Sequence, residues 1–304
     1  MSSGNRRILI TGAGGLIGRE TIKPLCEAGF EVFAVCRSKA AAEAARSVAE
    51  GGRVKFAECD LFDESALGAV FAEVKPQYLL NLAWKTTGDY LSSNLNFEYL
   101  RAGISMLEHF RKNGGVRAVY AGTCFEYKFK DSPLAESNGL DADKTAYTFC
   151  KDTLRRTAEY FCRKNSISFA YGRIFYVFGR GEDKSRLTGM IVDNLSQGRE
   201  VVIKSGSLVK DYMYAADIAA AFAAIAVSDV SGAVNVCSGR GITVADFARS
   251  VAEKLGRPEL LRFEEQPSNQ PPAIVGDNRR LIGEVGFTPK YDLSSALDDM
   301  IFRR

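Results

Sequence analysis

One glycine-rich stretch near the amino terminus, RILITGAGGLIG from Arg7 to Gly18, most constrains the fold of this chain. An apolar run meets a cluster of glycines and then residues that favour a helix, which is typical of a buried strand, a turn and a helix N-terminus. The first N–H groups of a helix lack partners within it and its dipole is positive there, so such a turn can bind a phosphate. The alternative is a glycine-rich turn that binds nothing.

The glycines of this stretch have separate expected roles. Gly12 permits the sharp turn, Gly15 lets the backbone approach a pyrophosphate, and Gly18 lets the helix pack closely on the strand. These roles predict a dinucleotide cofactor at the turn.

Apolar segments alternate with helical segments through the first half of the chain. After the glycine turn, strands are expected at 31–35, 54–59, 78–83 and 116–122, with a helix before each. Such alternation requires right-handed crossovers and a parallel sheet covered on both faces. The predicted fold is α/β, a doubly wound Rossmann sheet with a smaller C-terminal substrate-binding lobe. Expected boundaries are 1–175 for the dinucleotide-binding domain, with 211–240 returning to it, and 176–210 and 241–304 for the lobe.

Composition narrows the class of ligand. The 304 residues carry a formal charge of +3, and the basic residues are scattered, so neither a nucleic acid nor a membrane surface is an expected partner. No apolar segment approaches the length of a membrane span, and a cytoplasmic protein is expected. The seven cysteines stand singly, which favours reduced core thiols over a metal site. The one histidine, His109, is expected to pack at a helix end.

The end of the second strand bears on which dinucleotide binds. An NAD-binding fold usually has an acidic residue there to accept from the ribose hydroxyls. Here the strand ends in Cys36-Arg37-Ser38-Lys39, and an arginine suits the extra ribose phosphate of NADP. The alternative is that Arg37 and Lys39 are solvated loop charges. Asp60, after the third strand, either accepts from the adenine amino group or caps the next helix.

Tyr147 and Lys151 stand four residues apart in a segment that is predicted to be a helix, so both side chains project from one face. A lysine ammonium one turn away favours the phenolate and is expected to lower the tyrosine pKa toward neutrality. Thr123, after the fifth strand, supplies a hydroxyl that can hold a reacting oxygen beside the phenol. Taken singly, a Tyr–Lys pair is more often a surface pair and such a Thr a helix cap.

Together these motifs resemble those of the extended short-chain dehydrogenase/reductases, the group of nucleotide-sugar epimerases, dehydratases and reductases. The resemblance covers nearly the whole chain and is carried by TGAGGLIG, Asp60-Leu61, Ala121-Gly122-Thr123, Tyr147-Thr-Phe-Cys-Lys151, RIFYVFG from Arg173, Lys210-Asp211-Tyr212 with Asp217, and VNVCSG from Val234. It implies that Tyr147 is the catalytic acid/base, that Lys151 binds cofactor and tunes Tyr147, and that Thr123 orients the substrate oxygen.

The sequence also departs from that group. Its sugar dehydratases carry Asp and Glu after the catalytic Thr, whereas this chain has Cys124 and Phe125, so dehydration is not expected unless Glu126 substitutes. Tyr176 replaces the usual asparagine of a nucleotide-sugar contact. Lys210 replaces an arginine and can neutralise a phosphate, without a bidentate fork. Tyr99 stands near where the group often has an asparagine.

The predicted site has three sets of residues. The catalytic set is Thr123, Tyr147 and Lys151. The cofactor-binding set is Gly12, Gly15, Leu16, Ile17, Gly18, Arg37, Asp60, Leu61, Ala83, Lys151 and Ile174. The substrate-binding set is Cys124, Tyr176, Arg186 and Lys210.

These residues favour an NADPH-dependent reductase of a nucleotide-activated 4-keto-deoxysugar, with hydride transfer to the carbonyl carbon and Tyr147 as proton donor. NADP is expected in preference to NAD. The alternatives are a 4-epimerase with retained NAD, a non-catalytic dinucleotide sensor or scaffold, and a reductase of a non-nucleotide carbonyl. Apolar stripes on helices 96–112 and 145–164 predict a homodimer, unless both stripes pack on the sheet.

Overall fold

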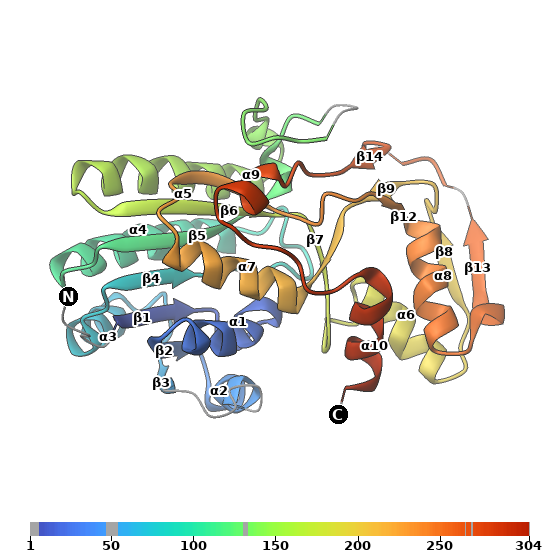
Figure 1. Cartoon of the computed structure of the whole chain (residues 1–304), viewed down its shortest axis with the longest axis horizontal. Helices are drawn as coiled ribbons and strands as arrows, with labels where there is room; N and C mark the ends of the chain where they lie inside the picture. Colours follow the sequence, from blue (N-terminus) through green and yellow to red (C-terminus); the bar gives the residue numbers. More distant parts are fainter. Residues whose placement is uncertain (1–5, 47–53, 130–132, 265, 269, 304) are drawn as a thin grey trace.

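A seven-stranded sheet forms the centre of the larger half of the molecule (Figure 1). The computed structural model describes residues 6–46, 54–129, 133–264, 266–268 and 270–303. In spatial order the strands are β11 (Gly232–Val236), β6 (Ser168–Ile174), β5 (Arg117–Thr123), β4 (Tyr78–Asn81), β1 (Arg6–Thr11), β2 (Phe30–Cys36) and β3 (Val54–Glu58). Every neighbouring pair is parallel. The sheet confirms the predicted doubly wound α/β fold.

Helices cover both faces of this sheet, because its central strands are apolar on both sides. One face carries α1 (Leu16–Glu27) and α7 (Ala215–Val227), and the other carries α3 (Glu64–Val74), α4 (Leu95–Lys112) and α5 (Ala146–Lys164). Ile22 of α1 and Phe222 of α7 belong to one hydrophobic core. Phe71, Phe110 and Leu154 belong to a second core under α3, α4 and α5. The short helix α2 (Lys39–Arg46) follows β2.

The smaller half lies at one end of the sheet and has a core of its own. Its elements are α6 (Leu187–Ser196), β8 (Val201–Lys204), α8 (Val244–Lys254), the 3-10 turn η3 (Pro258–Leu260), β13 (Leu261–Glu264) and α10 (Leu293–Phe302). Short strands stand between the halves: β7 (Tyr176–Phe178) pairs with β10 (Tyr212–Tyr214), and β9 (Val209–Lys210) lies between β12 (Ile242–Thr243) and β14 (Ala273–Ile274). The remaining elements are η1 (Cys124–Glu126), η2 (Ala142–Lys144) and α9 (Arg279–Gly283).

Side-chain caps fix the helices that carry or flank the predicted site. Thr145 caps α5, because its hydroxyl accepts from the Thr148 N–H at 3.1 Å. Asp63 caps α3 by accepting from the Ala66 N–H at 3.0 Å. Asp60 is therefore not the cap of that helix, and its carboxylate instead accepts from the Phe62 N–H at 3.1 Å.

The strand expected at 78–83 is shorter in the structure and ends at Asn81. From Leu82 the chain leaves the sheet and passes directly over Gly12. A Cβ atom on Gly12 would lie 2.8 Å from the Leu82 carbonyl carbon and the Ala83 nitrogen. The glycine turn and the end of β4 are thus fitted to each other, and pairing beyond Asn81 gives way to that crossing.

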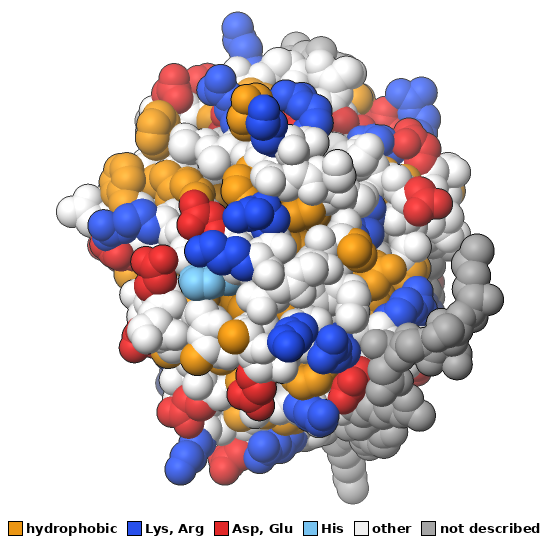
Figure 2. Space-filling model, turned by 90° about the vertical axis from the view of Figure 1, so that its left-hand side faces the viewer, with side chains coloured by type: hydrophobic (Ala, Val, Ile, Leu, Met, Phe, Trp, Pro, Cys, Tyr) orange, Lys and Arg blue, Asp and Glu red, His pale blue; other side chains and the backbone are white. Residues whose placement is uncertain are grey.

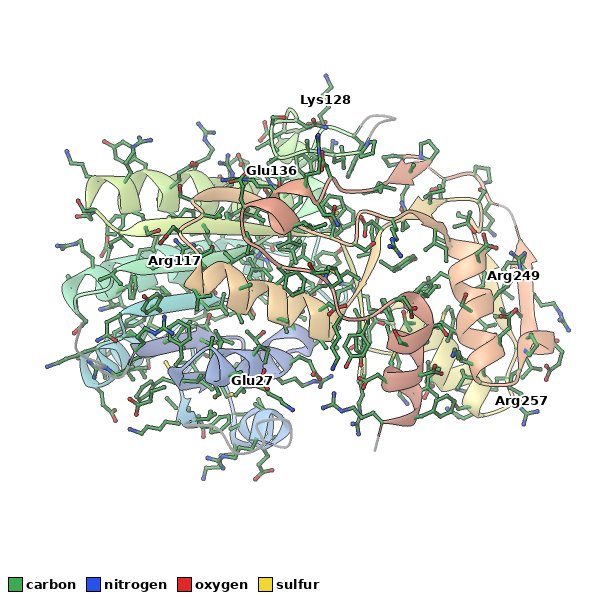
Figure 3. The ribbon with its side chains drawn as sticks, in the orientation of Figure 1. Glu27, Arg117, Lys128, Glu136, Arg249 and Arg257 are labelled. Carbon is green, nitrogen blue, oxygen red and sulfur yellow. The ribbon has the colours of Figure 1, made fainter. Side chains whose placement is uncertain are left out.

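Two polar side chains tie the sheet to its surroundings. Arg117, at the start of β5, is buried and donates to the carbonyl oxygens of Ile225 and Val230 at 2.7 and 2.8 Å, so it anchors the end of α7. Figure 3 shows Arg117 within the sheet layer, whereas Arg249 and Arg257 project from the smaller half. Glu136 accepts from the Asn235 N–H at 2.7 Å and fixes the segment after η1 to β11.

Charges of both signs are interspersed on the face that carries the single histidine (Figure 2). His109 lies in the last turn of α4 and stacks on the Phe71 ring at 6.0 Å between ring centroids, which is a packing role. Six of the seven cysteines are buried, and Cys26 is partly buried. Within the described ranges, no helix combines the length and the apolar character needed to cross a membrane.

Candidate active site

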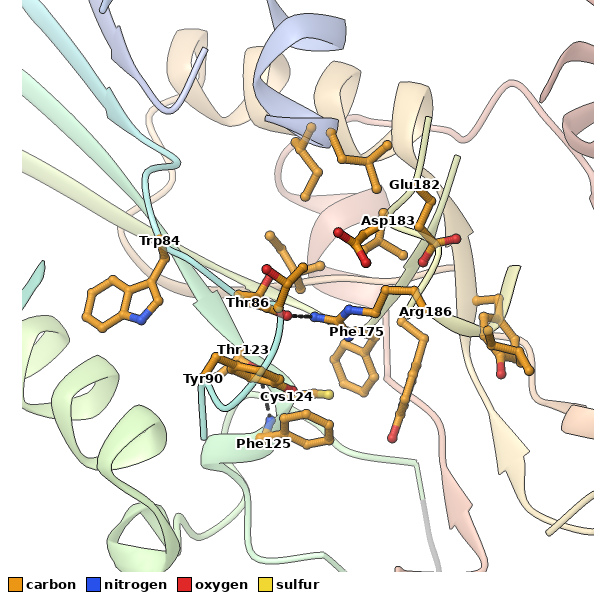
Figure 4. A pocket seen from close by; sticks show the side chains of 18 of the residues that line it. Trp84, Thr86, Tyr90, Thr123, Cys124, Phe125, Phe175, Glu182, Asp183 and Arg186 are labelled. Carbon is orange, nitrogen blue, oxygen red and sulfur yellow. Dashed lines mark hydrogen bonds between the residues drawn. The ribbon is translucent and has the colours of Figure 1, made fainter. Parts of the chain in front are cut away.

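Two adjoining cavities lie beyond the carboxyl ends of the sheet strands, where parallel sheets bind their ligands. The larger, about 660 Å³, is called the central pocket and lies between the sheet and the smaller half (Figure 4). The smaller, about 410 Å³, is called the β2–β3 pocket because residues after β2 and β3 line it. Gly12, Gly15 and Trp84 line both cavities.

Every residue of the predicted site lines one of these two cavities. The β2–β3 pocket takes Arg37, Asp60, Leu61 and Ala83. The central pocket takes Leu16, Ile17, Gly18, Thr123, Cys124, Tyr147, Lys151, Ile174, Tyr176, Arg186 and Lys210. Gly12 and Gly15 belong to both. Side chains that are up to 200 residues apart in the sequence are thus gathered at one edge of the sheet.

The glycine turn fits the pyrophosphate of a dinucleotide. Gly12 has a φ of +73°, a conformation that other residues rarely adopt. A Cβ on Gly18 would lie 2.1 Å from the Gly12 carbonyl oxygen, so only glycine lets α1 start this close to the turn. Gly15, at the N-cap of α1, has no side chain to cover the free N–H groups of the first helical turn. The backbone there is open to an anion.

The β2–β3 pocket combines a cation with an aromatic stack. Arg37 lines it at the end of β2, next to Ser38, and the one acidic side chain among its lining residues is Asp60, after β3. Tyr99 stacks on Trp84 at 5.1 Å and meets the Phe62 ring edge-on at 5.0 Å. Burial raises the pKa of Tyr99, and the nearby Arg37 opposes that shift.

Thr123, Tyr147 and Lys151 meet at the floor of the central pocket. Thr123 is the last residue of β5, and Tyr147 and Lys151 lie in the first two turns of α5. All three are buried, with 5% of each residue exposed. The Thr123 and Tyr147 hydroxyls lie close to each other. The Lys151 ammonium donates to the Ala121 carbonyl oxygen at 2.8 Å and lies 4.0 Å from the centre of the Trp84 ring.

The electrostatics of this pair differ from the sequence-based expectation. Burial raises the pKa of Tyr147 above its ordinary value, and the nearby Thr123 hydroxyl only partly opposes this. Burial likewise lowers the pKa of Lys151 to about 7. The predicted lowering of the tyrosine pKa was wrong for this state, because loss of water outweighs the attraction of an ammonium that points at Ala121 and Trp84. Tyr147 therefore keeps its proton at neutral pH.

Glu126 is occupied by structural bonds and does not replace the missing acids at Cys124 and Phe125. It is fully buried, and its Oε1 accepts from the Tyr171 hydroxyl at 2.6 Å and from the Thr123 N–H at 3.3 Å. Its Oε2 pairs with the Arg173 guanidinium at 2.9 Å. A carboxylate held in this way fixes the Thr123 backbone and has no path to a substrate proton.

The opposite wall of the central pocket carries three of the four predicted substrate residues, Tyr176, Arg186 and Lys210, whereas Cys124 follows Thr123 on the sheet side. Lys210 is 3% exposed, and its ammonium lies 5.2 Å from the centre of the Tyr176 ring. Neither the Lys210 ammonium nor the Tyr176 hydroxyl has a hydrogen-bond partner among the described residues. Arg186 donates to the Thr86 carbonyl oxygen and lies 5.3 Å from the Tyr90 ring centre (Figure 4). Burial lowers the pKa of Lys210 to about 8.

Among the lining residues of the central pocket that sequence reasoning missed, three lie close to the predicted site residues or carry a shifted pKa: Trp84, Tyr90 and Glu182. Trp84 lies over Lys151, and Tyr90 meets the Tyr147 ring edge-on at 5.1 Å between centroids. Glu182, before α6, faces the pocket with Asp183 and Arg186 (Figure 4), and burial raises its pKa to about 7. Trp84 could have been singled out from the sequence, because it is the single tryptophan of the chain and stands directly after a predicted strand. Tyr90 and Glu182 lie in irregular segments, where no periodicity shows which side chains turn inward.

Comparison with known proteins agrees with this geometry. Over 96% of its length the chain is 25% identical to UDP-glucose 4-epimerase of Bacillus subtilis, of which it covers 95%. It is 23% identical to a dTDP-4-dehydro-6-deoxy-D-allose reductase of a Streptomyces species, with 94% of this chain and 92% of that protein covered. The fold is that of Thermus thermophilus UDP-glucose 4-epimerase in complex with NAD, with a TM-score of 0.84, 21% identity, and coverage of 98% of this chain and 100% of that one.

The family assignment rests on a match to a family model over most of the chain. Residues 8–237, which include the glycine turn, Thr123, Tyr147 and Lys151, match the NAD dependent epimerase/dehydratase family. The expected resemblance to extended short-chain dehydrogenase/reductases is confirmed. The chain belongs to the NAD-dependent epimerase/dehydratase family and is an NAD(P)-dependent enzyme of the extended short-chain dehydrogenase/reductase type.

Proposed function

We propose that this protein is an NADPH-dependent reductase of a nucleotide-activated 4-keto-deoxysugar. The observation that carries the proposal is the end of β2, where Arg37 rather than a carboxylate lines the β2–β3 pocket. A guanidinium there suits the ribose 2′-phosphate of NADP. A net reductase exchanges its cofactor at every turnover, as NADPH is used up. One of the similar proteins is itself named as a reductase of a dTDP-4-dehydro-6-deoxy sugar.

The residues at the pocket floor suit reduction. When bound, NADPH would supply the hydride that reduces the carbonyl carbon. Tyr147, which burial keeps protonated, donates its proton to the carbonyl oxygen, and a proton from solvent restores the phenol. Thr123 holds that oxygen beside the phenol, and Lys151 binds the nicotinamide ribose and supports the phenolate that forms. Together these steps convert a ketone, NADPH and one proton into an alcohol and NADP⁺.

The opposite wall supports an activated sugar as the substrate. The Lys210 ammonium is a buried cation without a hydrogen-bond partner in the described ranges, and it suits an anionic phosphate oxygen. Phe125, Phe175 and the Tyr176 ring add apolar surface to the same cavity, as a deoxygenated sugar ring requires. The tyrosine at position 176 also keeps a non-nucleotide carbonyl substrate as an alternative.

A 4-epimerase with retained NAD is the second candidate. Thr123, Tyr147 and Lys151 would serve it equally, since an epimerase oxidises and re-reduces the same carbon. Two of the similar proteins named above are UDP-glucose 4-epimerases, one of them with NAD bound. This candidate predicts NAD that stays with the protein through purification. A non-catalytic sensor is not supported, because it has no use for Thr123, Tyr147 and Lys151 gathered in one cavity.

Calorimetric titration of the cofactor-stripped protein with NADPH and NADH tests the cofactor half of the proposal. Wild-type protein should bind NADPH more tightly, and Arg37→Asp should reverse the preference by about 10- to 100-fold, the worth of one charge-assisted contact. Lys39→Asp is the matched control, because it makes the same charge change beside the pocket without lining it. An unchanged preference in Arg37→Asp would show that the ribose phosphate is read elsewhere.

Turnover tests the substrate half of the proposal. Oxidation of NADPH is followed by absorbance with nucleoside-diphosphate 4-keto-6-deoxy sugars, and the product is identified by NMR. The reductase requires one NADPH per sugar reduced. Interconversion of UDP-glucose and UDP-galactose with bound NAD, and no net NADPH oxidation, would establish the epimerase instead.

A homodimer through α4 and α5 is a further part of the proposal. Phe97 of α4 is 42% exposed, and Phe149 and Tyr160 of α5 are 44% and 61% exposed. Large apolar side chains on adjacent helices are the surface that a second copy would cover. Light scattering of wild type and Phe149→Glu checks this: the wild type should have twice the mass of the chain, and the variant should shift toward the monomer.

A further inference from the structure

We propose that Trp84 is a positioning residue for the Tyr147–Lys151 pair, with its indole held in place by Asn96. This inference rests on the roles proposed above for Tyr147 and Lys151, but not on which sugar is reduced. The indole face meets the Lys151 ammonium at 4.0 Å from the ring centre, and the indole also meets the Tyr147 ring edge-on at 6.2 Å. One aromatic side chain thus contacts both members of the pair.

The contact with Lys151 compensates for the burial of a charge. Among the described residues the Lys151 ammonium has one hydrogen-bond acceptor, the Ala121 carbonyl oxygen at 2.8 Å, although an ammonium can donate three bonds. The negative face of an indole is the best aromatic surface for a cation, and the attraction grows when water is excluded. Trp84 therefore favours the charged form and restricts where the ammonium can lie.

The indole itself is rigidly anchored. Its Nε1–H donates to the Asn96 Oδ1 at 2.8 Å, and Tyr99 stacks on the ring at 5.1 Å. Asn96 is 2% exposed, and its Nδ2 donates to the carbonyl oxygens of Tyr90 and Ser93 at 2.7 and 2.8 Å. Every hydrogen-bonding atom of the Asn96 amide is thus engaged.

Asn96 also holds a second residue, Tyr90, that packs against the Tyr147 ring. The loop that it holds carries Tyr90, whose ring packs edge-on against Tyr147 at 5.1 Å. Trp84 and Tyr90 are therefore fixed by one buried amide, and each supports the Tyr147 ring. Figure 4 shows Trp84 on the loop after β4, with its ring directed away from Glu182 and Arg186. Trp84 acts on the catalytic pair from the sheet side of the pocket, not on the substrate wall.

Fluorescence of the free protein tests the contact directly, because Trp84 is the single tryptophan of the chain. Lys151→Met should change the emission maximum or intensity of Trp84, since it removes a charge lying on the indole face. The matched control is Lys144→Met, because Lys144 lies over Phe129 at 5.0 Å and not over the tryptophan. The spectrum of Lys144→Met should match that of wild type. Identical spectra for wild type and Lys151→Met would overturn the proposal.

Kinetics test whether the contact matters to the reaction. Trp84→Leu should lower kcat about tenfold with little change in KM, the size of a desolvated cation–π contact. Trp84→Phe keeps an aromatic face and should recover most of that loss. Leu100→Ala, in the same hydrophobic cluster, controls for lost packing and should leave kcat unchanged. Equal losses in Trp84→Leu and Trp84→Phe, or no loss in either, would contradict the proposal. The fluorescence result stands even if the sugar assay shows no reductase activity, so the two proposals fail separately.

Discussion

The two walls of the central pocket differ in how their buried polar atoms are bonded. On the sheet side, the network lies behind the lining residue Thr123: Glu126 bonds Tyr171 and Arg173, and Arg173 also donates to the Tyr127 hydroxyl at 3.2 Å. Tyr127 in turn donates to the Asn235 Oδ1 at 2.7 Å. On the opposite wall, the Tyr176 hydroxyl, the Glu182 Oε2 and the Lys210 ammonium are buried without a partner in the described part of the chain.

This difference separates what the fold provides for itself from what it provides for a ligand. A buried polar atom without a hydrogen bond costs about 1–3 kcal/mol, so the bonded sheet-side wall stabilises the chain and the opposite wall weakens it. The bonded network also fixes the backbone of Thr123, the residue proposed to hold the substrate oxygen. The opposite wall offers a cation, a hydroxyl and a carboxylate to whatever enters the pocket. We therefore expect mutations on the sheet side to damage catalysis or folding, and mutations on the opposite wall to alter substrate binding.

Tyr147→Phe, at the floor of the central pocket on the sheet side, gives the largest expected effect. Removing the proton donor should lower kcat by about 10²–10⁴-fold, the usual contribution of general acid catalysis. Cofactor affinity should stay close to that of wild type, because the phenyl ring keeps its contacts with Trp84 and Tyr90. Stopped-flow turnover and calorimetric cofactor binding measure the two quantities. A variant that turns over at the wild-type rate would remove Tyr147 from the mechanism.

Glu126→Gln tests whether the sheet-side wall is held by its buried ion pair. The amide leaves the Arg173 guanidinium uncompensated in a dry environment, and breaking such a pair usually costs about 3–5 kcal/mol. The free energy of unfolding in denaturant should fall by this amount at pH 7. Glu159→Gln, which breaks an exposed pair with Arg155, is the control and should change stability by less than about 1 kcal/mol. Equal small losses in both variants would show that the two walls do not differ as argued.

Lys210→Met tests the opposite wall, because it removes a buried charge that has no hydrogen-bond partner among the described residues instead of breaking a buried ion pair. It removes a buried ammonium whose pKa is lowered to about 8 by burial, so the free energy of unfolding should not decrease. Substrate binding should weaken by about 10- to 100-fold, the worth of one hydrogen bond to a charged group. KM and thermal melting of the free protein are the measurements. A loss of stability without a rise in KM would place Lys210 with the structural residues instead.

Much of the fold was predictable because its signals are local. The glycine turn, the alternation of apolar strands with helices and the four-residue spacing of Tyr147 and Lys151 each depend on near neighbours in the chain. The same local reasoning placed the helix that carries Tyr147 at 145–164, within one residue of α5, and left open whether Asp60 caps α3. It did not predict that β4 ends at Asn81, because that end depends on the fit between Leu82 and Gly12, which are 70 positions apart.

The sequence predicted which residues gather at the two cavities, but it did not predict their electrostatics. The sequence places Thr123, Tyr147 and Lys151 together, yet it does not give their burial, which raises the pKa of Tyr147 and lowers that of Lys151. It also gives no sign that Trp84 lies on Lys151. Such contacts arise where separate segments converge on one side chain, so neither spacing nor composition reveals them. The bonds of Glu126 are of the same kind, since its partners Thr123, Tyr171 and Arg173 come from two strands, β5 and β6, that are far apart in the sequence.

Glu182→Gln gives the smallest expected effect. It tests whether removing a charge from the opposite wall raises the free energy of unfolding, whereas removing Glu126 on the sheet side should lower it. Burial raises the pKa of Glu182 from its ordinary 4.5 to about 7, so its stabilising contribution is complete below pH 4.5 and is lost as pH rises through 7. At pH 8 the wild-type carboxylate is charged and poorly solvated. The glutamine variant should then be more stable by about 1–2 kcal/mol, because the side chain is only partly buried and solvent screens part of the shift.

The pH dependence of stability shows whether the gain in Glu182→Gln comes from removing the carboxylate charge. The stability advantage of Glu182→Gln should shrink as the pH falls from 8 to 5, because the wild-type carboxyl then takes up its proton. Asp183→Asn is the matched control on the neighbouring residue, since a Ser185 hydrogen bond lowers the pKa of that exposed carboxyl, and it should bring no gain at pH 8. Thermal melts across this pH range measure both. A Glu182→Gln variant that is destabilised at pH 8, as Glu126→Gln is expected to be, would mean that the opposite wall is built to stabilise the chain and not to receive a ligand.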